Sequence, residues 1–509
     1  MKIKKVLIAN RGEIALRVIR TLREMGIRSV AVFSDADRME LHVRSADEAF
    51  PIGPPAPSES YLRGDKIIEV ARDAGCQAIH PGYGFLSENA DFARAVEDAG
   101  LIFIGPSADS IARAGDKVEA RRAMLAAGVP VIPGSDGPVE NPDELAGIAK
   151  RIGYPVALKA VGGGGGKGIR VVHEESELRA AFERASSEAL SAFGNAAMYV
   201  EKFLVAPRHI EVQVFADNHG NTVHMGEREC SIQRRHQKLL EESPSPFVDD
   251  ELRARMGAAA VAAAEAVNYR NAGTVEFLVD AERNFYFLEI NTRIQVEHPV
   301  TEMIYGIDLV RLQVRAAEGR KLFFEQEQLV ASGHAIEVRL TAENPYTNFM
   351  PEAGIIRSVR MPQGPGVRID ASIFAGQEIK LFYDPMIGKI IAHGYDREDA
   401  TARMVRALME LRLVGVRTCA PLLLRVLQDE RFRKGETDTA FLEKYVAESD
   451  WRKLSDFGGI PADVPAVITA VLYAHQQKGS GKAVVSGAEA APGPSGSPWV
   501  AAGRNRWIR

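Results

Sequence analysis

The 509-residue sequence has few cysteines, no long apolar run and little excess charge of either sign. Its three cysteines, Cys76, Cys230 and Cys419, lie far apart, which excludes a disulfide framework and the ligand spacing of a zinc site. No apolar run reaches membrane-spanning length, and the run at residues 6–9 is too short for a secretory signal, so we expect a cytoplasmic protein without a membrane anchor. The net charge of −5 argues against a nucleic-acid-binding protein but permits a local basic site.

The length and composition are those of a globular protein with two or three domains, since 46% of the residues are hydrophobic and 26% are charged. Residues 5–9 and 28–33 have strand character, and apolar residues recur at helical spacing over residues 12–25 between them. This βαβ pattern predicts a parallel sheet at the N-terminus. A further short strand at 77–79 leads into a glycine-rich turn with Tyr83 at its tip, which fits either a ligand crevice or an ordinary turn.

A run of glycines separates two predicted strands, residues 154–160 and 169–172. It matches neither common nucleotide motif, because a strand rather than a helix follows it and no Ser or Thr follows Lys167. A strand–loop–strand flap with many unhindered backbone N–H groups, flanked by Lys159, can wrap a polyphosphate and close over it. A passive linker is the alternative, although a linker between two strands is unusual.

The stretch from Glu289 to His298 has the strongest functional pattern in the chain. At period two its polar residues fall on one side of an extended chain, opposite the apolar Ile290, Ile294 and Val296. These polar residues are Glu289, Asn291, Arg293, Gln295 and Glu297.

The strand before this stretch supplies an acidic partner. Residues 274–280 and 285–291 read as a hairpin, and pairing Asp280 with Phe285 places Glu276 opposite Glu289. Cross-strand neighbours lie roughly 5 Å apart, where two carboxylates repel one another unless a cation such as Mg2+ lies between them. The alternative is a slipped register that leaves both acids in water.

Other segments carry weaker signals. Residues 208–216 alternate between polar and apolar side chains and read as a strand. The cluster of Arg234, Arg235, His236 and Lys238 suits anions but also fits a solvated basic loop. Strand patterns at residues 334–340, 367–373, 379–383 and 386–392, with a helix at 398–411, predict a β-rich C-terminal region. Residues 478–497 read as a flexible linker, and the final twelve residues contain two tryptophans and three arginines, which fits either a docking segment or a disordered tail.

Five segments in order closely resemble the biotin carboxylase family of ATP-grasp enzymes: ANRGEIALR at 9–17, HPGYGFLSENA at 80–90, KAVGGGGGKGIRVV at 159–172, RRHQKLLEE at 234–242 and EINTRIQVEHPVTE at 289–302. The resemblance covers residues 1–450 and implies an α/β and α+β multidomain fold. Its parts would be an N-terminal parallel α/β domain at 1–115, an ATP-grasp region at 116–330 with a mobile lid at about 131–204, a β-rich C-terminal domain at 331–450 and an extension at 451–509.

The resemblance also implies the chemistry. ATP and bicarbonate would give carboxyphosphate, whose CO2 carboxylates biotin on a carrier protein. Residues matching the family's ATP contacts are Lys117, Lys159, Gly162, Gly163, Gly164, Gly165, Gly166, Lys167, Gly168, Glu201, Lys202, Leu204, His209, Gln233, His236, Glu276 and Glu289. Those matching its Mg2+ (or Mn2+) ligands are Glu276, Glu289 and Asn291, and those matching its bicarbonate site are Lys238, Arg293, Gln295, Val296 and Glu297. Glu297 matches the base, Arg339 the group that stabilises the biotin enolate, and Tyr83 a residue against the biotin ring.

The expected partners follow from the same resemblance. The sequence contains no Ala/Val-Met-Lys-Met biotinylation motif, so the biotin carboxyl carrier protein must be another chain. A separate carboxyltransferase chain, a homodimer or a larger assembly, and an acetyl-CoA, propionyl-CoA or pyruvate carboxylase complex are implied. Two other functions remain open, another ATP-grasp ligase and a catalytically silent scaffold of a carboxylase complex, although intact Lys238, Arg293, Glu297 and Arg339 disfavour the scaffold.

Overall fold

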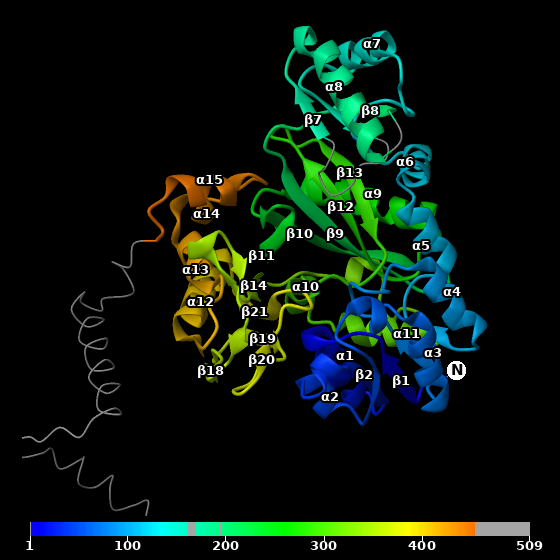
Figure 1. The fold of residues 1–509 in the computed structure, drawn as a ribbon, viewed down its shortest axis with the longest axis vertical. Coiled ribbons are helices and arrows are strands. Elements are labelled where there is room, and N and C mark those ends of the chain that lie inside the picture. Colours follow the sequence, from blue (N-terminus) through cyan, green and yellow to red (C-terminus); the bar gives the residue numbers. More distant parts are fainter. Residues whose placement is uncertain (1, 161–168, 194–195, 453–509) are drawn as a thin grey trace, which may run out of the picture. The chain divides into compact units, whose positions relative to one another are not determined.

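A computed structural model describes residues 2–160, 169–193 and 196–452 of the chain (Figure 1). Residues 1–449 form one compact unit, and of the second unit, residues 450–509, only residues 450–452 are described. The predicted glycine loop at 162–168 and the Trp/Arg tail therefore lie outside the described residues. Within the described ranges, no helix is both long and apolar enough to cross a membrane.

The N-terminal region contains the predicted parallel sheet, with strand order β3-β2-β1-β4-β5. Its strands are β1 (Lys5–Ile8), β2 (Arg28–Ser34), β3 (Glu48–Gly53), β4 (Ala78–His80) and β5 (Ile102–Phe103). Its helices are α1 (Gly12–Glu24), α2 (Leu41–Ser45), α3 (Gly64–Asp73), α4 (Ala90–Asp98) and α5 (Ala108–Gly115). Helix α1 forms because Ile14, Val18 and Leu22 recur at intervals of four and bury one face in the core.

A small antiparallel sheet with order β7-β6-β8 follows. It consists of β6 (Val156–Ala160), β7 (Ile169–Val172) and β8 (Met198–Lys202), preceded by α6 (Lys117–Ala126) and α7 (Pro142–Ile152), with α8 (Glu175–Phe193) between β7 and β8. Helices α7 and α8 lie beside this sheet (Figure 1). Leu145 of α7 and Phe182 of α8 share one hydrophobic core with Val156 and Val200 of the sheet. Strands β6 and β7 pair on either side of the predicted glycine loop, as expected for a strand–loop–strand flap.

An eight-stranded antiparallel sheet with order β13-β12-β9-β10-β11-β14-β21-β19 is the largest sheet of the described residues and is called the central sheet below. Its strands are β9 (Arg208–Ala216), β10 (Thr222–Arg234), β11 (Gln237–Ser243), β12 (Asn271–Val279), β13 (Phe285–Asn291), β14 (His334–Thr341), β19 (Val367–Ala371) and β21 (Met386–Gly394). The alanine-rich helix α9 (Asp250–Ala266) packs on the apolar side chains of β9 and β12. The opposite face of these strands carries His209, Glu211 and Glu276, so the sheet separates a core from a polar face.

The remaining helices and strands complete the C-terminal region. The helices are α10 (His298–Tyr305), α11 (Leu309–Ala317), α12 (Arg397–Glu410), α13 (Ala420–Gln428), α14 (Glu430–Arg433) and α15 (Phe441–Glu448). The short strands β15 (Glu343–Asn344), β16 (Met350–Pro351), β17 (Gly354–Ile355), β18 (Ser358–Arg360), β20 (Glu378–Ile379) and β22 (Arg412–Val414) form three two-stranded pairs.

One predicted strand, residues 379–383, is wrong beyond its first residue. Strand β20 ends at Ile379, and Leu381 and Phe382 are exposed. Tyr383 instead packs its ring at 5.6 Å from that of Tyr61, and its hydroxyl donates to the Pro55 carbonyl at 2.7 Å. These contacts with the N-terminal region pull the chain out of strand pairing.

Candidate active site

Glu276 of β12 and Glu289 of β13 face one another across the hairpin, as the sequence predicts. The register that led to this prediction is nevertheless wrong at the turn, because Phe285 pairs with Val279 rather than with Asp280. A bulge between the pairs Phe277–Phe287 and Glu276–Glu289 adds one residue to β13 and restores the predicted pairing of the two acids. The extra residue, Leu288, is exposed and lines the cavity described below.

The predicted extended chain from Glu289 to Glu297 is also wrong beyond Asn291, where β13 ends. Ile294 turns into the N-terminal core and is fully buried, and Arg228 draws the Gln295 side chain inward with a 2.6 Å hydrogen bond. The chain therefore folds into a turn before α10. Its polar side chains still converge, because all five predicted ones line a single cavity.

This cavity has a volume of about 1130 Å³ and lies on the polar face of the central sheet. The predicted residues that line it are Lys159, Glu201, Lys202, Leu204, His209, Gln233, His236, Lys238, Glu276, Glu289, Asn291, Arg293, Gln295, Val296, Glu297 and Arg339. Apolar side chains that were not predicted, Ile132, Phe203 and Leu278, supply part of its wall. The structure thus brings together residues from β6, β8, β9, β10, β11, β12, β13, β14 and the turn before α10.

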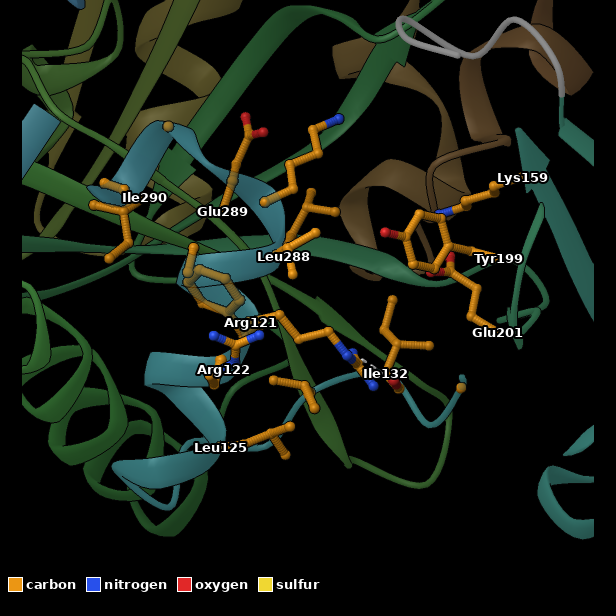
Figure 2. A pocket seen from close by; sticks show the side chains of 18 of the residues that line it. Arg121, Arg122, Leu125, Ile132, Lys159, Tyr199, Glu201, Leu288, Glu289 and Ile290 are labelled. Atoms are coloured by element: carbon orange, nitrogen blue, oxygen red, sulfur yellow. Dashed lines mark hydrogen bonds and ion pairs between the residues drawn. The ribbon is translucent and has the colours of Figure 1, made fainter. Parts of the chain in front are cut away.

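A second cavity of about 800 Å³ shares Lys159, Glu201 and Glu289 with the first and extends towards α6. Lys117 lines this second cavity rather than the first. Figure 2 shows Lys159, Tyr199 and Glu201 on one side and Arg121 with Arg122 from α6 on the other. Lys159 forms an ion pair with Glu201 across β6 and β8.

Lys238 is the electrostatic centre of the larger cavity. Its Nζ donates to three carboxylates, at 2.6 Å to Glu211, 2.8 Å to Glu276 and 2.7 Å to Glu297. Burial alone would lower the pKa of Lys238, but the three carboxylates outweigh it and hold the pKa well above its usual value. A fixed positive charge therefore lies between the two facing acids and the turn before α10.

The two facing acids have opposite electrostatic environments. Burial alone would raise the pKa of Glu276, but Lys238 and His209 outweigh it and hold the pKa well below its usual value, so this carboxylate is ionised. Burial, followed by repulsion from Glu276, raises the pKa of Glu289. A divalent cation between them would remove that repulsion, and Asn291 adds a nearby amide oxygen, so the donor set fits Mg2+.

Glu297 is held by two cations. Its Oε1 lies 2.7 Å from Lys238 and its Oε2 accepts a 2.9 Å hydrogen bond from Arg339, which also donates to Glu241 at 2.5 Å. Burial alone would raise the pKa of Glu297, but Lys238, Arg339 and Arg228 hold it far below its usual range. Glu297 is thus an ionised carboxylate whose basicity is masked by its partners.

Arg293 lies at the edge of the cavity. Its Nε donates to Glu88 at 3.0 Å, and its Nη2 donates to the Asn291 side-chain oxygen at 3.0 Å. The predicted metal ligand Asn291 therefore shares its oxygen with the predicted bicarbonate ligand. An oxyanion that bound Arg293 would compete with both contacts.

Tyr83 lines neither cavity. It lies between two glycines with positive φ in the turn after β4, and its hydroxyl donates to the Glu13 carboxylate of α1. The structure therefore places the predicted biotin contact next to the N-terminal helix, half-buried, rather than among the cavity residues.

Three residues of the site were missed from the sequence. Glu211 is fully buried and bonds Lys238, while Arg228 bonds Glu211 at 2.5 Å and Gln295 at 2.6 Å. Glu211 could have been found, because His209, Glu211 and Gln213 alternate with apolar residues in the predicted strand 208–216 and thus share one face. Glu88 lies in the glycine-rich segment but carries no local signal for its pairing with Arg293.

Three family models match the chain. Residues 2–111 match the biotin carboxylase N-terminal domain, 116–324 the ATP-binding domain of the carbamoyl-phosphate synthase L chain, and 337–444 the biotin carboxylase C-terminal domain. Among curated proteins, a pyruvate carboxylase subunit of Methanothermobacter thermautotrophicus is 52% identical, over 93% of this chain and 99% of that protein. Biotin carboxylase 1 of Bacillus subtilis is 54% identical, over 87% and 99%.

Solved structures agree in fold. The biotin carboxylase domain of thermophilic 2-oxoglutarate carboxylase bound to bicarbonate superimposes with a TM-score of 0.84 at 45% identity, covering 87% of this chain and 98% of that one. The biotin carboxylase–β,γ-ATP complex from Campylobacter jejuni has a TM-score of 0.81 at 46% identity, covering 87% and 99%. The predicted ATP-grasp architecture with an N-terminal parallel sheet and a β-rich C-terminal region is confirmed. By sequence and by fold, this chain belongs to the biotin carboxylase family.

Proposed function

We propose that this protein carboxylates biotin on a separate carrier protein, using ATP and bicarbonate. The observation that carries the proposal is one cavity that joins two facing carboxylates, a buried lysine and the paired Glu297 and Arg339. Such a site can hold a metal–nucleotide at the paired acids and a small oxyanion beside them. Relatives of similar length are biotin carboxylases, and solved relatives hold ATP analogues or bicarbonate.

In this proposal the nucleotide lies between the small sheet β7-β6-β8 and the central sheet. Apolar Leu204 and Leu278 suit the adenine base, while Lys159 and His236 suit polar groups of the nucleotide. The glycines and Lys167 of residues 162–168 would contact the phosphates, although they lie outside the described residues. Mg2+ or Mn2+ at Glu276 and Glu289 would neutralise charge on the phosphates.

Bicarbonate would bind beside the turn before α10. Arg293 presents a planar fork that matches a carbonate group, and the Gln295 side chain, the Val296 backbone and Lys238 complete the site. The proton of bicarbonate would pass to a Glu297 oxygen. Because Lys238 and Arg339 now occupy that carboxylate, bicarbonate must take over part of their hydrogen bonding before Glu297 can act as a base.

The second half of the proposed reaction concerns biotin. Carboxyphosphate would break into CO2 and phosphate, and the phosphate would take the N–H proton of the biotin ureido group. The ureido nitrogen would then attack CO2, while Arg339 stabilises the negative charge on the ureido oxygen. The proposed contact of Tyr83 with the biotin ring requires the ring to reach the turn after β4, next to Glu13.

The proposed domains end at residues 115, 330 and 450, close to the ranges of the three family models. The proposed partners are a biotin carboxyl carrier protein, a second copy of this chain and a carboxyltransferase subunit; the proposed compartment is the cytoplasm.

Residues 451–509 are proposed to dock on the carboxyltransferase. A chain cut after Glu448 should lose co-purification with the carboxyltransferase, and undiminished assembly would refute the docking role.

The test of the function is phosphate release by the purified chain with Mg2+ and ATP. Release should require bicarbonate and should increase with free biotin. Another ATP-grasp ligase, making an amide or carbamoyl product, would show no stimulation by free biotin even if its phosphate release required bicarbonate. An inactive scaffold would release no phosphate under any of these conditions.

A further inference from the structure

Lys389 is one of the largest fully buried side chains of the described residues. It lies on β21, where it pairs with Arg339 of β14 on one side and Asp370 of β19 on the other. Lysine is almost never fully buried unless its charge is paired. Lys389 does not line either cavity, so its burial needs a reason other than direct contact with a substrate.

The ammonium group of Lys389 contacts two parts of the site. Its Nζ donates a 2.5 Å hydrogen bond to the Val296 carbonyl in the turn before α10, and it lies 3.5 Å from a carboxylate oxygen of Glu13 on α1. The same Glu13 oxygen accepts the hydrogen bond from Tyr83. One lysine therefore connects the bicarbonate side of the proposed site with the Tyr83 turn.

The contact with Val296 fixes the direction of a backbone donor. The Gln295 carbonyl, which belongs to the same peptide group as the Val296 N–H, accepts a 2.7 Å hydrogen bond from His298. The Val296 carbonyl, on the other side of the same α-carbon, is held by Lys389. With both peptide groups fixed, the Val296 N–H and the following Glu297 side chain have set directions.

The charges around Lys389 explain why this position holds a cation. Glu13 and Glu337 are buried, and one oxygen of Glu13 and both oxygens of Glu337 have no hydrogen-bond partner among the described residues. Asp370 is already bound by Arg368. A neutral side chain at position 389 would still fill space, but it would leave Glu13 and Glu337 without the positive charge of Lys389.

We propose that Lys389 is a positioning residue for biotin carboxylation, acting through the Val296 peptide on bicarbonate and through Glu13 on Tyr83. The inference rests on the proposed function, since it assigns the Val296 backbone to bicarbonate. Loss of the charged hydrogen bond from Lys389 to the turn should raise the KM for bicarbonate by roughly 10-fold or more.

The test compares steady-state kinetics of K389M with the wild type. The KM for bicarbonate should rise roughly 10-fold or more, the KM for free biotin should also rise, and the KM for MgATP should stay within about 2-fold. K380M is the control, because Lys380 also donates to a backbone carbonyl, that of Ala36 at 2.8 Å, but this acceptor lies in the N-terminal region and not in the turn before α10. Its constants should match those of the wild type.

A double variant, E13Q/K389M, separates positioning from stability. It removes a buried charge that K389M leaves unpaired, so it should recover melting temperature without recovering the KM for bicarbonate. If either folded variant has the wild-type KM for bicarbonate, or if neither variant folds, the positioning role is overturned. An inactive wild type would refute the proposed function instead, which keeps the two failures distinguishable.

Discussion

Replacing Glu297 with glutamine removes the proposed base and leaves its surroundings almost intact. Glu297 is 2% exposed, and its two oxygens contact Lys238 at 2.7 Å and Arg339 at 2.9 Å. Glutamine has the same shape and can still accept one of these bonds. Lys238 keeps Glu211 and Glu276, and Arg339 keeps Glu241, so neither cation is left unpaired.

The expected effect is large on turnover and small on nucleotide binding. General-base catalysis contributes about 10²- to 10⁴-fold, so bicarbonate-dependent phosphate release by E297Q should fall by at least about 10²-fold, a barrier increase of about 3 kcal/mol. Affinity for MgATP should not fall, because the glutamine removes a negative charge near the phosphate site.

The assay is single-turnover phosphate release at saturating bicarbonate, combined with calorimetric titration of an ATP analogue. E241Q is the matched control, because Glu241 is the other carboxylate partner of Arg339 and does not line the cavity. Bicarbonate-dependent turnover should fall far less in E241Q than in E297Q. An equal fall in turnover in the two variants would mean that the placement of Arg339, rather than proton transfer to Glu297, accounts for the lower rate. Wild-type turnover in E297Q would refute the role of Glu297 as the base.

Three further predictions follow from the same contacts. R293A removes the guanidinium group proposed to bind bicarbonate, together with its hydrogen bond to Glu88. This variant should bind MgATP normally while bicarbonate-dependent turnover falls about 10²-fold or more. Normal turnover would count against Arg293 as a bicarbonate ligand. E289Q removes one of two facing carboxylates, so the Mg2+ concentration needed for half-maximal activity should rise at least about 10-fold, whereas Glu276 stays bound to Lys238. Burial raises the pKa of Glu40 from 4.5 to about 7, so the folded state binds this proton more tightly than the unfolded state, and stability falls as pH rises from 4.5 to 7. The E40Q variant does not lose this stability, which amounts to about 3 kcal/mol of unfolding free energy. Its melting temperature relative to that of the wild type should therefore increase between pH 5 and pH 8. A constant difference would contradict the raised pKa of Glu40.

Local patterns were enough to predict the elements that hold the site. The strand at residues 208–216 and the β13 boundary agree with the structure, because alternation and turn residues mark them clearly. The opposed acids Glu276 and Glu289 were also predicted, although the assumed register at the turn was off by one and a bulge at Leu288 corrected it. Bulges are set by packing across strands, which one strand's sequence does not record.

Contacts between distant segments were the part that sequence reasoning missed. Lys238 was predicted as an anion ligand, but its pairing with Glu211, Glu276 and Glu297 depends on three strands and the turn before α10 meeting in the fold. The turn after Asn291 was read as extended because its polar residues alternate. Burial of Ile294 in the N-terminal core overrides that local pattern.

The most direct test of the account is the position of the metal in crystals grown with Mn2+, ADP and bicarbonate. An anomalous peak about 2.0–2.4 Å from carboxylate oxygens of both Glu276 and Glu289, with bicarbonate on Arg293, is the predicted result. Glu211 and His209 also lie near Glu276 and form the nearest competing set of ligands among the described residues. A peak at that set, or no Mn2+ near Glu289, would contradict the proposed site.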